Sequence, residues 1–316
     1  MKEALLTVQG PDTGMVPVVT SHEPSQSTSA AVHPEVGTGV MLMIGSCLSL
    51  QFGAALAVSV FPIMGPLGTT SFRFAVAALV VVALFRPKFW TWGGKQWLSV
   101  VCFGAVLSCM NAFFYLAIDR LPMGIAVSLE FLGPLLLAGI LSRKLRDFGW
   151  IALALGGISL FFFDDFTGDT RLDPLGVGFV LVAAFCWALY ILCGSWVAQR
   201  VPGTGGIAGA LVIGTVCLMP FGAQSAHFIV DDPMLLLFCV GSGLLSLAIP
   251  YSLQFMAMRR IPKSVFGVLL SLEPVFAALV GWLILGQSLS VLAVLAIVLV
   301  VTASAGSTLG ARAKAS

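Results

Sequence analysis

Charge is scarce in this 316-residue chain: only 9% of its residues are charged, whereas 59% are hydrophobic and the mean hydropathy is +1.03. A soluble domain carries about a quarter of its residues as charged side chains. Most of this chain must therefore face lipid or other helices, which excludes an ordinary soluble protein. Its basic residues are dispersed over short loops rather than gathered in a patch, so we expect no nucleic-acid partner.

Groups that hold metals, disulfides or nucleotides are also scarce or scattered. The seven cysteines lie within apolar runs and form no CxxC pair, which is typical of small packing residues. His22, His33 and His227 are too far apart in the sequence to indicate a metal site. No Walker-type glycine-rich loop occurs. We therefore expect no cofactor, no metal and no hydrolysis of ATP by this chain.

Both ends of the chain differ in composition from the rest. Residues 1–38 are rich in Ser, Thr, Pro and Val and contain no apolar run long enough for a signal peptide. We expect a disordered cytoplasmic tail there, and a second short cytoplasmic tail at residues 311–316.

Long hydrophobic runs fill the rest of the chain. A bilayer core of about 30 Å needs about 20 apolar residues per helix. Turn-like breaks, such as Phe61-Pro62, Asp173-Pro174 and Asp232-Pro233, separate the runs. The pattern predicts an all-α integral membrane protein with ten transmembrane helices near 40–60, 67–85, 97–118, 122–142, 148–163, 175–199, 207–228, 235–257, 263–285 and 289–309.

The distribution of basic residues predicts the orientation of these spans. Cytoplasmic loops of membrane proteins collect Lys and Arg. With the amino terminus inside, the outer loops hold only Arg120 and Arg171 among the cations. The inner segments hold Lys2, Arg86, Lys88, Lys95, Arg143, Lys144, Arg146, Arg200, Arg259, Arg260, Lys263, Arg312 and Lys314. Both termini are therefore predicted to be cytoplasmic.

One segment occurs twice, with opposite flanking charge. Pro122 and Pro134 recur as Pro262 and Pro274, each 140 positions later. The first copy follows an Asp-Arg pair, whereas the second is flanked by three cations and no acid. The two copies should therefore face opposite sides of the membrane. This predicts two inverted five-helix repeats, residues 39–165 and 166–310, as in many secondary transporters.

Three charged residues remain inside the predicted spans: Arg73, Glu130 and Glu273. An ionisable group in hydrocarbon costs several kcal/mol unless it is paired or hydrated. Helix rise places all three near the middle of the membrane, with Arg73 and Glu130 at similar depth. We expect Arg73 and Glu130 to bind substrate and Glu130 and Glu273 to carry protons. The alternatives are a permanent structural pair of Arg73 with Glu130, and a Glu273 that only caps a broken helix.

Polar and aromatic side chains gather at the same depth. Asn111 and Tyr115 are four residues apart and share a helix face, and Tyr251 lies next to a proline in the eighth span. We include these three in the predicted substrate site. Gly133-Pro134 and Glu273-Pro274 interrupt their spans, and broken helices at the midplane of paired repeats indicate a transport site.

The stretch from residue 111 to 134, NAFFYLAIDRLPMGIAVSLEFLGP, resembles the threonine/homoserine exporter branch of the EamA group in the drug/metabolite transporter superfamily. Pro250–Leu253, Ser271–Pro274 and the closing Gly306–Leu309 fit as well. The resemblance implies ten helices in two repeats and export of small amino acids across the bacterial inner membrane. Many members of the wider group carry Gly-Glu where this chain has Gly286-Gln287.

The sequence thus predicts a bacterial inner-membrane secondary transporter, not an enzyme. It would export threonine or homoserine, with a proton gradient as energy source and alternating access as mechanism. A zwitterion fits because Arg73 matches a carboxylate and Glu130 an ammonium group. The alternatives are a drug or metabolite exporter of the same fold, and an integral-membrane enzyme, which is disfavoured because the polar cluster lies mid-membrane rather than at a membrane face.

Overall fold

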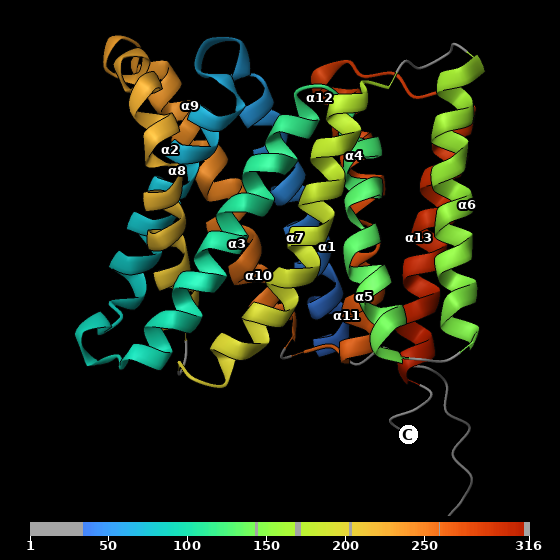
Figure 1. Cartoon of the computed structure of the whole chain (residues 1–316), viewed down its shortest axis with the longest axis horizontal. Coiled ribbons are helices and arrows are strands. Elements are labelled where there is room, and N and C mark those ends of the chain that lie inside the picture. Colours follow the sequence, from blue (N-terminus) through green and yellow to red (C-terminus); the bar gives the residue numbers. More distant parts are fainter. Residues whose placement is uncertain (1–33, 143–144, 168–171, 202–203, 259, 313–316) are drawn as a thin grey trace, which may run out of the picture. The chain divides into compact units, whose positions relative to one another are not determined.

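The computed structural model describes residues 34–142, 145–167, 172–201, 204–258 and 260–312. Within these ranges every long regular element is helical (Figure 1). The helices are α1 (Pro34–Val58), α2 (Phe61–Phe85), α3 (Gly94–Ile118), α4 (Met123–Glu130), α5 (Leu132–Ser142), α6 (Leu145–Thr167), α7 (Pro174–Ala198), α8 (Gly205–Asp231), α9 (Pro233–Gly243), the π-helical segment η2 (Leu244–Ala248), α10 (Ile249–Met258), α11 (Lys263–Leu270), α12 (Glu273–Leu285) and α13 (Val291–Arg312), with a short 3₁₀ turn, η1 (Phe89–Thr91), between α2 and α3.

Eight helical segments are long and apolar enough to cross a membrane, which confirms a multi-pass helical membrane protein. The predicted fifth and tenth spans correspond to shorter apolar stretches, Phe148–Phe163 in α6 and Val291–Ser307 in α13. The eight are Gly37–Val58, Phe61–Phe85, Gly94–Ile118, Met123–Leu141, Pro174–Ala198, Gly205–Ile229, Pro233–Gln254 and Val265–Leu285.

Three of the predicted breaks are helix starts rather than free turns. Asp173 and Asp232 are N-caps whose carboxylates accept hydrogen bonds from Leu175 N and Met234 N. Proline follows each aspartate at the first helical position, where its missing N–H costs nothing. Pro62 likewise lies at the start of α2, so this helix begins six residues earlier than predicted.

Helix α2 has a kink before it reaches the cavity described below. Gly65 has φ +68°, a left-handed conformation that only glycine adopts without strain, and Pro66 follows it. The hydroxyls of Thr69 and Thr70 donate to the carbonyls of Gly65 and Pro66. Both are bonds to the carbonyl four residues earlier, which lets a buried threonine hydroxyl find a partner inside a helix.

Element bounds repeat along the chain at the offset that the prolines indicated. Helix α1 begins at Pro34 and α7 at Pro174, 140 positions later. Helices α4 and α11 are both eight residues long, and each is followed by a break. Figure 1 shows α4 and α5 running from top to bottom, whereas α11 and α12 run from bottom to top.

Helix α1 begins within the segment predicted as a tail, so residues 34–38 are helical. Residues 1–33 and 313–316 lie outside the described part of the chain.

The apolar core has two large clusters of buried residues. One joins α4, α6, α12 and α13 with parts of α1 and α7, and the other joins α2, α3 and α8.

Candidate functional site: a charged cavity between broken helices

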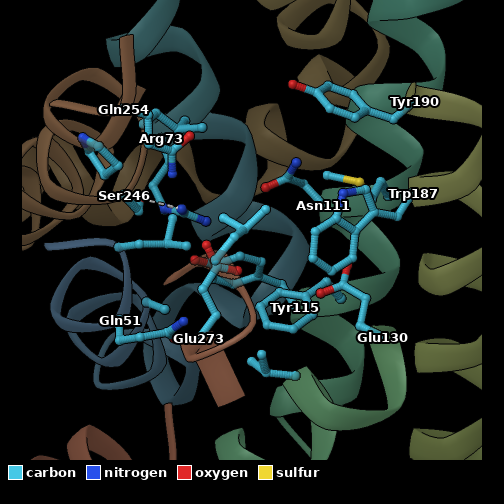
Figure 2. Close-up of a pocket in the computed structure, with 18 residues that line it drawn as sticks. Gln51, Arg73, Asn111, Tyr115, Glu130, Trp187, Tyr190, Ser246, Gln254 and Glu273 are labelled. Carbon is cyan, nitrogen blue, oxygen red and sulfur yellow. Dashed lines mark hydrogen bonds between the residues drawn. The ribbon is translucent and has the colours of Figure 1, made fainter. Parts of the chain in front are cut away.

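A cavity of about 210 Å³ lies among helices of both halves of the chain (Figure 2). Three of its lining residues are charged: Arg73 on α2, Glu130 at the end of α4 and Glu273 at the start of α12. The other lining residues are Leu50, Gln51, Ala54, Met110, Asn111, Phe114, Tyr115, Val127, Trp187, Tyr190, Ser246, Leu247, Pro250, Gln254 and Leu270. The structure therefore brings Arg73, Asn111, Tyr115, Glu130 and Glu273 together, as the sequence predicted.

Arg73 is 1% exposed and has unused hydrogen-bonding capacity. Its Nη2 donates to the hydroxyl of Ser246, while Nε and Nη1 have no hydrogen-bond partner among the described residues. The guanidinium carbon lies 4.1 Å from the centre of the Tyr115 ring, a cation–π contact. A buried cationic donor without partners is costly, so these two nitrogens with their N–H groups indicate a place for an anionic ligand.

Ser246 was not predicted as a site residue. It lies in the π-helical segment η2, four residues before Pro250, whose missing N–H leaves the carbonyl of Ser246 without its helical donor. The Ser246 hydroxyl also donates to the carbonyl of Ser242, which fixes it for Arg73. The sequence signal that could have predicted Ser246 as a site residue is its position four residues before a proline inside a membrane span.

Helix α1 supports this irregular segment from the other side. The hydroxyls of Ser46 and Ser49 donate to the carbonyls of Pro250 and Leu245. The backbones also approach closely, because a Cβ added at Gly53 would lie 2.6 Å from the backbone nitrogen of Ser246. Non-helical backbone inside a membrane protein needs such partners, and here α1 supplies them.

Glu130 is the last residue of α4 and is 8% exposed. Pro134 has no N–H to donate to the carbonyl of Glu130, so the helix is interrupted at this point. Gly133 brings α5 directly against α7, since an added Cβ would lie 1.9 Å from the carbonyl oxygen of Ala184. The Phe131 ring packs edge-on against Trp187 on α7, with ring centres 4.8 Å apart. The break therefore places Glu130 beside the aromatic wall of the cavity.

Glu273 is the first residue of α12, is 6% exposed and precedes Pro274. It occupies the corresponding break of the second half, but three positions later in the repeat. Glu130 corresponds to Leu270 at the offset of 140, and Glu273 corresponds to Gly133. The two acids thus reach one cavity from non-equivalent positions of two similar breaks.

Arg73 does not form the predicted alternative of an ion pair with Glu130. Arg120 with Asp173, 2.7 Å apart, is the one ion pair within the described ranges. Arg73 and Glu130 were predicted at similar depth, but their side chains do not form an ion pair, because Arg73 points from α2 toward η2 and Tyr115. Tyr251, the remaining predicted contact, has a side chain outside the described residues.

The amide of Asn111 has a defined orientation. Its Nδ2 donates to the carbonyl of Leu107 at 3.0 Å, and because a carbonyl only accepts, Oδ1 is the free end. Figure 2 shows the oxygen of Asn111 directed toward the side of Arg73. Trp187, Tyr190, Gln51 and Gln254 also belong to the polar and aromatic lining.

Comparison with known proteins agrees with this architecture. The EamA-like transporter family matches residues 174–309. Threonine/homoserine exporter RhtA of Salmonella typhimurium (strain SL1344) is 38% identical over 275 residues, covering 86% of this chain and 92% of that protein. RhtA of Escherichia coli (strain K12) is 37% identical with the same coverage. The uncharacterized transporter YwfM of Bacillus subtilis (strain 168) is 26% identical, covering 71% of this chain and 78% of that protein.

A solved crystal structure superposes with a TM-score of 0.57, covering 89% of this chain and 99% of that chain. Identity to it is 20%, so the superposition shows a shared fold and no more. The RhtA relatives, by contrast, align over most of both chains and are transporters, which makes this chain a multi-pass membrane transporter of a small molecule and not an enzyme. With its helical, apolar architecture and these alignments, the chain belongs to the EamA-like transporter family.

Proposed function

We propose that this protein exports small amino acids, with threonine and homoserine as the first candidates, in exchange for protons. The observation that carries the proposal is the buried guanidinium of Arg73, which presents two unpartnered nitrogen donors in a cavity that also holds two carboxyl groups. The names of the RhtA relatives support the choice of substrates.

The cavity suits a small zwitterion. The free Nε and Nη1 donors of Arg73 can give charge-assisted hydrogen bonds to a substrate carboxylate. Glu130 or Glu273 supplies the opposite charge for the ammonium group. At about 210 Å³ the cavity is below the roughly 300–1,000 Å³ of pockets for drug-sized ligands, which favours a small solute over the alternative of a drug.

Asn111 provides a reason why the substrate would carry a hydroxyl group. Because Nδ2 is bonded to the carbonyl of Leu107, the free Oδ1 is an acceptor. The hydroxyl of threonine or homoserine can donate to it, whereas an aliphatic side chain of similar size would leave it without a donor. A hydrogen bond of this kind contributes about 1 kcal/mol.

Charge balance in the cavity supports exchange for protons. Its lining holds one cation and two acids, so both acids cannot be ionised without leaving an excess negative charge in a poorly hydrated site. A bound proton removes that excess from one acid. A zwitterionic substrate brings no net charge, and its ammonium group can pair with that acid only after the proton has left. We propose that proton and substrate therefore occupy the acids in turn, with Glu130 as the main coupling group.

We also propose ten crossings arranged as two inverted halves, with both termini in the cytoplasm of a bacterial cell and the protein in the inner membrane. The recurrence of element bounds at 140 positions supports the two halves, and the opposite course of α4–α5 and α11–α12 supports their inversion (Figure 1). In this arrangement the cavity would open alternately to either side.

Uptake of labelled threonine into inside-out vesicles that contain the protein tests the proposed function. Uptake should depend on an imposed proton gradient, and unlabelled homoserine should compete. Uptake no greater than in vesicles with an inactive Arg73→Met variant would contradict the choice of substrate. Competition by cationic dyes but not by homoserine would favour the alternative cargo.

A further inference from the structure

A tight seam closes one end of the bundle between α4 of the first half and α12 of the second. A Cβ added at Gly124 would lie 2.7 Å from the Cβ and 2.9 Å from the Cα of Ala278. Contacts this short leave room for no side chain at position 124. The start of α4 therefore meets the middle of α12 backbone to backbone, and the end of α12 leads to the turn that holds Gln287.

Gln287 connects the two helices at this seam. Its Oε1 accepts a hydrogen bond from the backbone N–H of Met123 at 3.0 Å, across 164 positions of sequence. Pro122, the N-cap residue of α4, provides no side-chain acceptor of its own. Gln287 therefore supplies a cap to a helix that would otherwise have an unsatisfied donor.

The turn after α12 holds Gln287 in place. Gly286 has φ +65°, and the N–H of Gln287 donates to the carbonyl of Gly281 at 3.1 Å. A Cβ at Gly281 would lie 2.6 Å from the Oε1 of Gln287. Glycine at 281 thus leaves the space in which the amide of Gln287 reaches Met123.

The corresponding end of the other half is not closed in this way. At the offset of 140, the counterparts of α4 and α12 are α11 and α5. Within the described part of the chain, α11 packs against α13, α1 and α10 and forms no comparable packing with α5. The two ends of the cavity are therefore different, although their helices are related by the repeat.

We propose that Gln287 and the seam of Gly124, Ala278 and Gly281 form the outer gate of the transporter, closed in this structure. The inference rests on the inverted halves proposed above. In the opposite state α4 and α12 separate at this end, the Met123–Gln287 bond breaks, and α11 closes on α5. Gln287 is a positioning residue: it acts on the far end of the helix that carries Glu130 and does not touch the substrate.

Three substitutions at the gate test the Met123–Gln287 hydrogen bond and the close packing at Gly124 independently of each other. Gln287→Met removes the acceptor at similar size and should favour the outward-open state about threefold to tenfold, the usual range for one lost hydrogen bond. Gln287→Glu keeps an acceptor at a helix N-terminus and should retain the closed state. Gly124→Leu should prevent closure. Gly178→Leu is the matched control, because a Cβ at Gly178 meets nothing within 4 Å.

Access to the cavity is measured with a cysteine at Leu50, a lining residue without an assigned role in binding. A membrane-impermeant maleimide labels Leu50→Cys in right-side-out and in inside-out vesicles, and labelling of the parent with its native cysteines is subtracted. Gln287→Met and Gly124→Leu should raise outer labelling several-fold and lower inner labelling. Gln287→Glu and Gly178→Leu should label as the parent does.

The gate would be refuted if Gln287→Met left outer and inner labelling unchanged in protein that extracts as a single monodisperse species. It would also be refuted if Gly178→Leu changed labelling as much as Gly124→Leu. If Gly124→Leu does not accumulate in the membrane, the labelling result for Gln287→Met alone decides whether the gate is correct. The labelling requires no substrate, so a failure to transport threonine would count against the proposed function without affecting this test.

Discussion

The guanidinium of Arg73 stacks on the ring of Tyr115, with 4.1 Å between the guanidinium carbon and the ring centre. The ring covers one face of the cation, and the hydroxyl of Ser246 accepts a hydrogen bond from its Nη2. The contact with the ring uses none of the hydrogen-bond donors of the guanidinium, and Nε and Nη1 have no partner among the described residues. A buried charge is thus held firmly without consuming the donors that a ligand needs.

Replacing Arg73 with Lys should weaken binding more than turnover. Lysine keeps the charge but loses the fixed planar donors, so a substrate carboxylate loses a directed, charge-assisted hydrogen bond. A charge-assisted hydrogen bond contributes about 1.5–3 kcal/mol, so KM for threonine should rise roughly tenfold to hundredfold. Gly178→Leu, at a position where an added Cβ meets nothing within 4 Å, is the control and should leave KM unchanged. An unchanged KM in Arg73→Lys would remove Arg73 from the substrate site.

Replacing Glu130 with Gln should abolish gradient-driven export without unfolding the protein. The amide keeps the shape of the carboxyl group but cannot exchange a proton. Threonine exchange across vesicles without a gradient should persist, which separates loss of coupling from loss of binding. Glu273→Gln is the parallel variant, since it neutralises the second acid of the cavity. Full dependence on the proton gradient in Glu130→Gln would exclude Glu130 as the coupling group.

Replacing Asn111 with Leu should reduce discrimination between threonine and valine, which have similar shapes. Wild-type protein should prefer threonine, because its hydroxyl donates to the free Oδ1 of Asn111. Loss of that bond at about 1 kcal/mol corresponds to a roughly fivefold loss of preference. Competition by unlabelled valine against labelled threonine measures the ratio. If the ratio is the same in both proteins, Asn111 does not contact the hydroxyl.

Asp173 should stabilise the start of α7 in a pH-dependent way. The hydrogen bond from Arg120 and, secondarily, that from the backbone N–H of Leu175 hold the pKa of Asp173 below its usual value. A lowered folded-state pKa gives stability that is present above the unfolded pKa of about 3.9 and is lost as the pH falls through the folded value. The midpoint of thermal unfolding should therefore fall more in Asp173→Ala than in Asp173→Asn, which can still cap the helix. The difference from wild type should disappear in strong acid.

Several features of the fold followed from local chemistry. Proline has no N–H, so Pro134 and Pro274 each remove a hydrogen bond from the backbone, and both lie in the first turn after a break. Charge was confined to a few positions, so three buried ionisable residues stood out and all three reached one cavity. The break predicted at Phe61-Pro62 does separate α1 from α2, but this proline lies within the first turn of α2, where it is tolerated, so the helix begins earlier than predicted.

The contacts within the site could not be predicted in the same way. Helix rise gives depth, and Arg73 and Glu130 were placed at similar depth, but depth does not define which way each helix faces. Ser246 has no charge and no motif, and its role depends on a π-helical turn supported by hydroxyls of α1. Gln287 looked like a loop residue at the membrane surface, whereas its amide caps a helix of the other half.

The sequence by itself determined that this protein crosses a membrane, where its helices break, and which ionisable groups remain in hydrocarbon, because hydropathy, the missing N–H of proline and the cost of buried charge act on the local chain. The tertiary structure alone decided that Arg73 is held by Ser246 and Tyr115 rather than by Glu130, and that one end of the cavity is closed by Gly124 and Gln287. These contacts join residues up to 173 positions apart, and they depend on how helices rotate and pack against one another, which no local pattern encodes.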